Sequence, residues 1–178
     1  MKKISFIFIL FFSSFLSLSQ VDTKKPITNN KPVHYIGLSG GGVTGLGFSY
    51  RYWPSKWGIQ ITGIPVFFAN KSGSFASIGL SALYTIKDNR FVDLYGYVGK
   101  QYLNYNQNYS YTDINGNLIE SSNSSSMYNI GTGFGFKFDF LDAFDFNFQT
   151  GIGMFGIANK SFSTITTLTA EIGLYYHL

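Results

Sequence analysis

Residues 128–140 have the sequence YNIGTGFGFKFDF. Every second position, from Tyr128 to Phe140, holds Tyr, Ile, Thr or Phe, and the positions between them hold Asn, Gly, Lys or Asp. Successive side chains of a β-strand point to opposite faces of the sheet. The alternation therefore predicts a strand with one largely aromatic face and one face of small or polar residues.

The same period of two residues recurs on both sides of this stretch, and no helical period competes with it. It predicts further strands over approximately 33–41, 45–52, 57–68, 76–86, 92–99, 144–152 and 168–178. Within 57–68 the apolar positions change from odd to even numbers after Thr62, which predicts a β-bulge at Gly63. A chain of 178 residues fits one domain. The pattern predicts an all-β fold, an eight-stranded antiparallel up-and-down β-barrel.

The two faces of the predicted strands differ in bulk, and this difference decides which face points inward. One face carries rows of Phe, Tyr, Ile and Leu, whereas the other is rich in Gly, Ser, Thr and Asn. Eight strands enclose an interior that is just wide enough for side chains to fill. Rows of aromatic rings would overfill it, so we expect the bulky face to point outward, where lipid covers it, as in a transmembrane barrel.

Charged side chains avoid the bulky face, with Lys100 as the exception. Charged residues make up only 12% of the chain. A cation at the lipid midplane costs roughly 2–4 kcal/mol, so this avoidance is expected of a membrane barrel. The charges on the other face are predicted to form a lumen network that consists of Arg51, Asp93, Lys137, Asp139, Asp145 and Glu171. We expect them to neutralise one another in a filled lumen, with ion conduction as the alternative.

The predicted connections alternate in character. Tight turns are predicted at Pro54–Lys56, Lys87–Arg90 and Leu141–Ala143, and polar connections at 70–74, 104–126 and 159–161. The stretch 104–126, rich in Asn, Tyr and Ser, is predicted to be a long loop. Short turns on the periplasmic rim and longer loops on the outer rim are typical of outer-membrane barrels. Aromatic residues near the tight turns are predicted to form an interfacial girdle of Trp53, Trp57, Phe140, Phe144 and Tyr176.

The N-terminal segment predicts export. Lysines at positions 2 and 3 precede an apolar stretch over 4–18, and small residues at 17 and 19 precede a predicted cut before Gln20. The apolar stretch is shorter than a membrane-spanning helix requires. We therefore expect a cleaved signal peptide at 1–19, a flexible periplasmic lead-in at 20–32 and the barrel at 33–178.

On these patterns, residues 33–178 resemble the small outer-membrane β-barrel families of the OmpX kind and of the OmpA transmembrane-domain kind. The resemblance implies a location in the bacterial outer membrane, contact with its lipid, and insertion by the barrel-assembly machinery. Such proteins end in an alternating strand with a terminal aromatic residue that this machinery reads. Leu174, Tyr176 and Leu178 match the alternation of this assembly signal, with Leu178 in place of the usual Phe.

Motifs that could carry chemistry are few. Residues 40–45, GGGVTG, match the dinucleotide-binding pattern GxGxxG, but that site needs a following helix, and residues 46–53 alternate as a strand. These glycines are expected to form a hairpin turn and small lumen residues. His34 and His177 are predicted to lie at neighbouring strand ends, without a Ser–base pair or a three-ligand metal set. Cysteine is absent. The sequence predicts no catalytic residue, cofactor or metal.

The sequence therefore predicts a non-enzymatic outer-membrane barrel with a structural, adhesive or surface-interaction role through extracellular loops, notably 104–126. The alternatives are a lipid-modifying outer-membrane enzyme or a barrel that handles a small apolar ligand. A third is a soluble exported barrel of the lipocalin type. The net charge of +4 without a basic stripe predicts no nucleic-acid partner. An extracellular ligand, if bound by the loops, is not identified by any motif.

Overall fold

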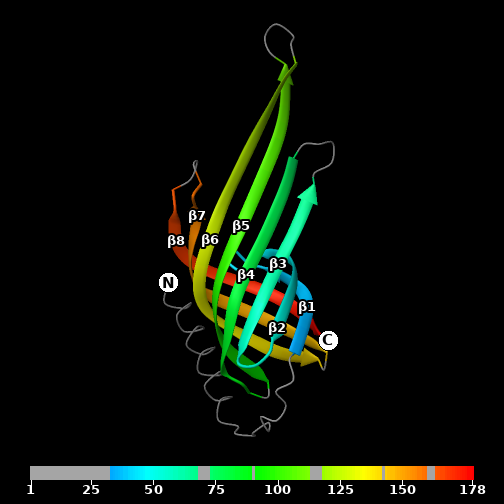
Figure 1. The fold of residues 1–178 in the computed structure, drawn as a ribbon, viewed down its shortest axis with the longest axis vertical. Helices are drawn as coiled ribbons and strands as arrows, with labels where there is room; N and C mark the ends of the chain where they lie inside the picture. The colour runs from blue at the N-terminus through cyan, green and yellow to red at the C-terminus, as the bar shows by residue number, and fades with distance from the viewer. Residues whose placement is uncertain (1–32, 68–72, 90, 113–117, 142, 160–162) are drawn as a thin grey trace, which may run out of the picture.

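The computed structural model describes residues 33–67, 73–89, 91–112, 118–141, 143–159 and 163–178. They form β1 (Val33–Gly40), β2 (Leu46–Trp53), β3 (Trp57–Phe67), β4 (Gly73–Lys87), β5 (Val92–Thr112), β6 (Leu118–Leu141), β7 (Phe144–Ile157) and β8 (Ile165–His177). Each strand pairs antiparallel with the next, and β1 pairs with β8 to close the ring (Figure 1). The predicted eight-stranded antiparallel barrel is confirmed. The predicted signal peptide and lead-in, 1–19 and 20–32, lie outside the described residues.

The two rims of the barrel differ. At one rim, which we name the turn rim, short connections join β2 to β3, β4 to β5 and β6 to β7. The described chain also begins and ends there, and the amide of Leu178 donates to the carbonyl of His34 at 2.9 Å. At the opposite rim, the ribbon rim, β5 and β6 rise beyond the other strands (Figure 1). β1 and β2 have only 8 residues each, whereas β5 has 21 and β6 has 24, so the wall is low on one side.

The prediction of a long loop over 104–126 is wrong. β5 and β6 stay paired without a shift from Val92 opposite Phe138 to Thr112 opposite Leu118. Residues 104–112 and 118–126 are therefore a two-stranded ribbon, which we name the ribbon. Its polar sequence lacks an apolar alternation because, among the described residues, no further strand pairs with its outer part: β4 reaches only Gln107, and the pairing with β7 begins only at Tyr128. The two strands stay paired nevertheless, because their backbones hydrogen-bond to each other and because tyrosine favours strands.

The predicted β-bulge at Gly63 is also wrong. The pairing of β3 with β4 runs without a shift from Trp57 opposite Tyr84 to Phe67 opposite Ser74. Ile64 and Val66 therefore stay on the lumen-facing phase of the strand, and both are half-buried. Before Gly63 the apolar residues of β3 point outward, and after it they point inward, although the strand itself continues without a bulge. The reason is that the lumen becomes apolar toward the ribbon rim.

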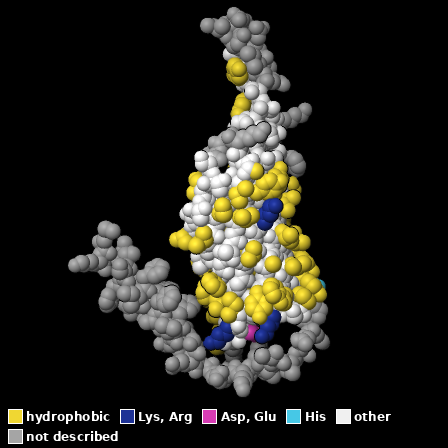
Figure 2. Space-filling model, turned by 60° about the vertical axis from the view of Figure 1, so that its left-hand side comes forward, with side chains coloured by type: hydrophobic (Ala, Val, Ile, Leu, Met, Phe, Trp, Pro, Cys, Tyr) yellow, Lys and Arg dark blue, Asp and Glu magenta, His cyan; other side chains and the backbone are white. Residues whose placement is uncertain are grey.

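The outward and inward faces are confirmed as predicted. Outward-pointing Phe134, Phe146 and Phe148 are 55%, 40% and 36% exposed. Gly135 and Gln149 on the opposite phase are buried. Hydrophobic side chains are spread over the visible wall between the rims (Figure 2). The barrel is therefore inverted relative to a water-soluble barrel, which keeps its bulky apolar residues inside.

Gly37 is expected to be essential to the closure of the ring. It faces Tyr175 across the seam between β1 and β8, and a Cβ added to it would lie 2.8 Å from the Cα of Tyr175. We expect Gly37→Val to lower the free energy of unfolding by about 1–3 kcal/mol, the usual cost of overpacking. Urea unfolding followed by tryptophan fluorescence measures this change.

Gly40→Val is the matched control in the same strand, because a Cβ there would meet nothing closer than Leu46 Cδ1 at 3.7 Å. Equal losses in the two variants would contradict the close approach of the strands at the seam.

Candidate functional site

Arg51 is the centre of a buried polar cluster in the lumen, and its side chain is only 2% exposed. Its Nε donates to Gln60 Oε1 at 2.8 Å, and its Nη1 donates to Asn147 Oδ1 at 2.5 Å. The guanidinium carbon lies 4.0 Å from the centroid of the Tyr175 ring, in a cation–π contact. Neutral amides and an aromatic ring therefore stabilise this buried cation.

The polar cluster continues toward the ribbon rim. Tyr95 Oη donates to Asn147 Oδ1 at 3.2 Å and accepts from Gln149 Nε2 at 3.0 Å. The Ser49 hydroxyl is hydrogen-bonded to Tyr175 Oη at 3.0 Å and to Thr62 Oγ1 at 2.8 Å. Hydrogen-bonded side chains thus fill this part of the lumen, as the narrow interior of an eight-stranded barrel requires.

The connection between β1 and β2, residues 41–45, folds into the lumen, and we name it the inner loop. Val43 and Thr44 in it are both 0% exposed. The amide of Gly41 donates to the carbonyl of Gly45 at 2.9 Å, and Gly45 has a φ of 104°, which favours glycine. The predicted hairpin turn is present, but its inward direction was not predicted.

Glu171 of β8 holds the inner loop from one side and is only 1% exposed. Its Oε1 accepts the amides of Val43 at 2.8 Å and Thr44 at 3.3 Å. The Thr44 hydroxyl donates to the other carboxylate oxygen. Hydrogen bonds to a charged acceptor are stronger than neutral ones, and the loop amides would otherwise be buried without a partner. The carboxylate therefore fixes the inner loop across the lumen.

Two amide side chains hold the inner loop from the other side. Gln101 Nε2 donates to the carbonyl of Gly41 at 3.3 Å, and Asn129 Nδ2 donates to the carbonyl of Gly42 at 2.9 Å. Asn129 Nδ2 also lies 2.9 Å from Gln101 Oε1, to which it donates. The inner loop is thus bonded through its amides and through its carbonyls, and it acts as a fixed plug.

Val43 fits into a hollow made by glycines on three neighbouring strands. Gly99 of β5 faces Gly131 of β6, which in turn faces Gly153 of β7. Cβ atoms added at these positions would lie 3.1, 2.9 and 3.0 Å from methyl carbons of Val43. Only residues without a side chain leave room for the valine. This row of glycines is a sequence signal for the plug, but it becomes readable only when the strand register is known.

The charges predicted to line the lumen do not form one network. Lys137 Nζ lies 2.7 Å from Asp93 Oδ2 and 3.6 Å from Asp139 Oδ1, close to the turn rim. Asp145 faces Asp139 across the pairing of β6 with β7. The structure brings these four charges together and places Arg51 and Glu171 apart from them, in the polar groups described above, which the hydrogen bond from Thr44 Oγ1 to Gln149 Oε1 connects.

The aromatic residues predicted to form a girdle take different positions. Trp57 is 62% exposed on the outer wall, where its ring centroid lies 4.7 Å from that of Tyr84. The rings of Phe144 and Tyr176, both exposed, lie 5.3 Å apart at the same rim.

Trp53 does not join these outward rings. It packs inward against the buried cluster that contains Leu83 and Tyr95, with its ring centroid 5.8 Å from that of Tyr95. The alternation explains this position, because Trp53 shares the inward phase of Arg51. The side chain of Phe140 lies outside what the structure describes.

The C-terminal residues and the histidines meet at the seam between β1 and β8. Leu174, Tyr176 and Leu178 of the predicted assembly signal are 49%, 43% and 65% exposed on the outer side. His177 stacks on Tyr35, with ring centroids 5.0 Å apart.

His34 belongs to the same region of the turn rim. Its Nδ1 lies 2.7 Å from Tyr50 Oη, within hydrogen-bonding distance. Among the described residues, no group of three or more His, Cys, Asp or Glu could hold a metal ion. The part of the chain that the structure describes also holds no helix with the length and apolar character needed to cross a membrane.

The ribbon presents tyrosines and a strand edge beyond the barrel. Tyr105, Tyr109 and Tyr111 are 40%, 41% and 55% exposed. β7 pairs with β6 only from Tyr128 onward, so in the described structure no strand lies beside the outer edge of β6 over 118–127. Such an edge offers a row of backbone hydrogen-bonding groups to another chain.

A closed ring of eight strands with an apolar outer wall and a polar filled lumen is the architecture of the small outer-membrane β-barrels. The fold is similar to that of Ail, the attachment invasion locus protein of Yersinia pestis, at 15% identity and a TM-score of 0.42, covering 83% of this chain and 95% of that chain. The structure of the outer membrane protein Ail in a phospholipid bilayer nanodisc gives 18% identity and a TM-score of 0.42, covering 83% and 98%.

Neisserial surface protein A is similar at 15% identity and a TM-score of 0.43, covering 82% of this chain and 93% of that chain. No family model and no curated protein matches the sequence. These likenesses concern the fold alone.

Removal of the Glu171 carboxylate is expected to loosen the inner loop. We expect Glu171→Ala to speed the hydrogen exchange of the Val43 and Thr44 amides by about tenfold or more, since a hydrogen bond to a charged acceptor contributes about 1.5–3 kcal/mol. Glu171→Gln, which keeps one acceptor oxygen, is expected to have a smaller effect. Amide exchange followed by NMR measures both.

Thr169→Ala is the control, because Thr169 Oγ1 donates a hydrogen bond to Glu171 Oε1 at 3.3 Å and lies in β8, outside the inner loop. Unchanged protection of Val43 and Thr44 in Glu171→Ala would show that the carboxylate does not hold the plug.

Proposed function

We propose that this chain is a non-enzymatic protein of a bacterial outer membrane, which spans the membrane as a barrel and makes contacts at the cell surface through the ribbon. The observation that carries the proposal is the inverted arrangement of the wall. Phe48 of β2 and Leu168 of β8 are 72% and 78% exposed, whereas Gln60 and Glu171 are buried inside. Only a lipid environment makes this arrangement favourable, because water would be in contact with most of the apolar surface.

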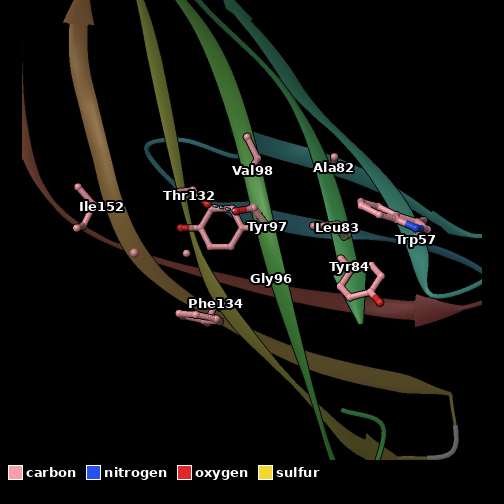
Figure 3. Close-up of a pocket in the computed structure, with 12 residues that line it drawn as sticks. Trp57, Ala82, Leu83, Tyr84, Gly96, Tyr97, Val98, Thr132, Phe134 and Ile152 are labelled. Atoms are coloured by element: carbon pink, nitrogen blue, oxygen red, sulfur yellow. Dashed lines mark hydrogen bonds between the residues drawn. The ribbon is translucent and has the colours of Figure 1, made fainter. Parts of the chain in front are cut away.

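A groove on the outer wall supports contact with lipid. It has a volume of about 590 Å³ and lies over β4 to β7, where the small residues Ala82, Gly96 and Thr132 are flanked by larger apolar ones (Figure 3). Thr132 is the polar residue of this row, and its Oγ1 donates to the carbonyl of Tyr97 at 2.7 Å. The hydroxyl group is therefore satisfied within the protein, as an apolar environment requires.

Lys100 supports a membrane boundary toward the ribbon rim. It points outward from β5, and its Nζ lies 4.8 Å from the centroid of the Tyr128 ring. Tyr102, the next outward residue on β5, packs against Tyr128 with ring centroids 5.1 Å apart. A lysine beside two tyrosines is typical of the membrane interface, where the long side chain brings its charge to the polar region. Outward residues nearer the turn rim, such as Val98, would contact the hydrocarbon.

The closed lumen favours a structural or surface role over conduction. The inner loop crosses the lumen, and the cluster around Arg51 fills the space beneath it. The ribbon is then the part of the described chain that extends furthest from the barrel (Figure 1). The proposal includes export by the predicted signal peptide at 1–19 and insertion by the barrel-assembly machinery through Leu174, Tyr176 and Leu178.

The two tryptophans provide a test of membrane insertion. The chain contains only Trp53 and Trp57. We expect the fluorescence of the Trp53→Phe variant, which reports Trp57, to be strongly quenched in bilayers of brominated phospholipid. The Trp57→Phe variant, which reports the inward Trp53, is expected to be quenched much less. Equal quenching of both, or a failure of the chain to enter bilayers, would contradict the proposed orientation.

The ribbon is tested by shortening it. Tyr105 faces Ser125, so residues 106–124 are replaced by an Asn-Gly turn that closes the hairpin at this register. We expect the shortened chain to assemble, with the faster gel migration of an unheated barrel, but to lose the adhesion of cells that display it to immobilised extracellular matrix proteins. The double variant Tyr109→Ser and Tyr111→Ser keeps the length and the strand edge of the ribbon but removes two tyrosines. It therefore distinguishes a contribution of the tyrosine side chains to adhesion from a contribution of the strand edge. Adhesion by the shortened chain equal to that of the intact chain would contradict a role of the ribbon.

A further inference from the structure

A cavity of about 490 Å³ lies on the ribbon-rim side of the inner loop. Apolar side chains from four strands form its wall, namely Phe75 of β4, Leu103 of β5, Met127 of β6 and Phe155 of β7. The inner loop forms its floor at Gly41 and Gly42. We name this cavity the cup. Its volume lies within the ~300–1,000 Å³ of small-molecule pockets.

The lining of the lumen differs on the two sides of the inner loop. Toward the turn rim, buried polar side chains such as those of Arg51 and Gln60 lie beside the buried apolar cluster that contains Leu83 and Tyr95. Toward the ribbon rim the lumen-facing positions become apolar, on β3 as well, where Ile64 and Val66 take the inward phase. Membrane insertion needs apolar residues on the outer wall only. An apolar lining in contact with water costs about 25 cal/mol per Å², so these inward residues favour an apolar occupant.

The polar groups of the floor already have partners inside the protein. The carbonyls of Gly41 and Gly42 accept from Gln101 and Asn129, and Gln101 Nε2 also donates to Ser77 Oγ at 3.0 Å. Asn129 Oδ1 accepts the amide of Gly156 at 3.0 Å. No charged side chain belongs to the described lining. A charged ligand would therefore find no counter-ion in the cup, which favours a neutral ligand.

The shape of the barrel sets how a ligand reaches the cup. β4 to β7 form a tall wall of 14 to 24 residues per strand, whereas β1 and β2 end near the level of the inner loop. Leu46, at the start of β2, lines the low side of the cup. The inner loop lies at the base of the cup, so we expect a ligand to enter from the side of the ribbon rim. A volume of about 490 Å³ suits a compact molecule rather than an extended chain.

We propose that the cup binds a small, neutral, compact aromatic molecule of one or two rings that enters from the ribbon rim. Phe75 and Phe155 supply aromatic faces and edges, and the thioether of Met127 makes favourable contacts with an aromatic ring. This site lies inside the barrel and is separate from the surface contacts of the ribbon.

The methionines provide a direct test. The chain contains Met1, Met127 and Met154, and Met154 is 41% exposed on the outer wall. The chain with ¹³C-labelled methionine methyl groups is placed in lipid nanodiscs and titrated with indole. We expect the Met127 methyl resonance to shift and to saturate. The Met154 resonance is expected to shift only in proportion to the indole dissolved in lipid.

Variants of Leu103 and Leu80 distinguish the cup from the lipid. Leu103→Trp fills the cup and is expected to weaken the saturable shift of Met127 at least tenfold. Leu103→Gln, which adds a polar group to the wall with little change in volume, is expected to weaken it as well. Leu80→Trp on the outer wall, at a position that is 58% exposed, is the control and should leave the titration unchanged.

Three results would overturn the proposal. A Met127 resonance that never saturates would show that indole does not occupy the cup. Shifts of Met127 that follow those of Met154 would show that Met127 senses only the indole that is dissolved in lipid. Unchanged saturation in both Leu103 variants would place the bound indole elsewhere.

Discussion

The narrow interior of a ring of eight strands is the constraint on which the rest of this structure depends. Such a ring encloses only enough space for its own side chains. The rows of Phe, Ile and Leu must therefore point outward, and glycine, serine and amide side chains must point inward. The outer wall consequently matches lipid, and the polar side chains of the lumen must bond to one another. The hydrogen bonds of Arg51 with Gln60 and Asn147 follow from this restriction.

The same restriction explains the inner loop. A loop enters so narrow a lumen only where the opposite wall lacks side chains, and Gly99, Gly131 and Gly153 provide that space for Val43. Its buried backbone groups then need partners. Glu171 accepts the amides, and Gln101 and Asn129 donate to the carbonyls. The plug is thus a consequence of packing and hydrogen bonding together.

The inner loop divides the lumen into two parts with different roles. The part toward the turn rim is filled by polar side chains and by the buried cluster that contains Leu83 and Tyr95, which makes the barrel a rigid support. The part toward the ribbon rim is apolar and contains the cup. Because β1 and β2 are short, the inner loop lies deep relative to the tall strands β4 to β7, and this difference in height creates the cup. The unequal lengths of the strands therefore give rise both to the ribbon, for which we propose surface contacts, and to the cup, for which we propose ligand binding.

The alternation in the sequence determined the number of strands, their order and the direction of their faces. These features depend on the local period of two residues, which each strand carries in its own sequence. It also placed Arg51 and Glu171 in the lumen and Trp57 on the outer wall. The tertiary structure alone decided how far the strands extend, which is why residues 104–126 form a ribbon instead of a loop. Likewise, the sequence predicts a bulge from the positions of Ile64 and Val66, because it does not show that the lumen becomes apolar at their level.

Contacts between residues that lie far apart in the sequence could also not be predicted from it. Glu171 lies 128 positions from Val43, and only the closed ring brings them together. The separation of Arg51 from Lys137 and its aspartates depends on the register of several strands, as does the alignment of the three glycines. A repeating pattern specifies the face of each side chain, but the neighbours across that face follow from the way in which the strands pair and the ring closes.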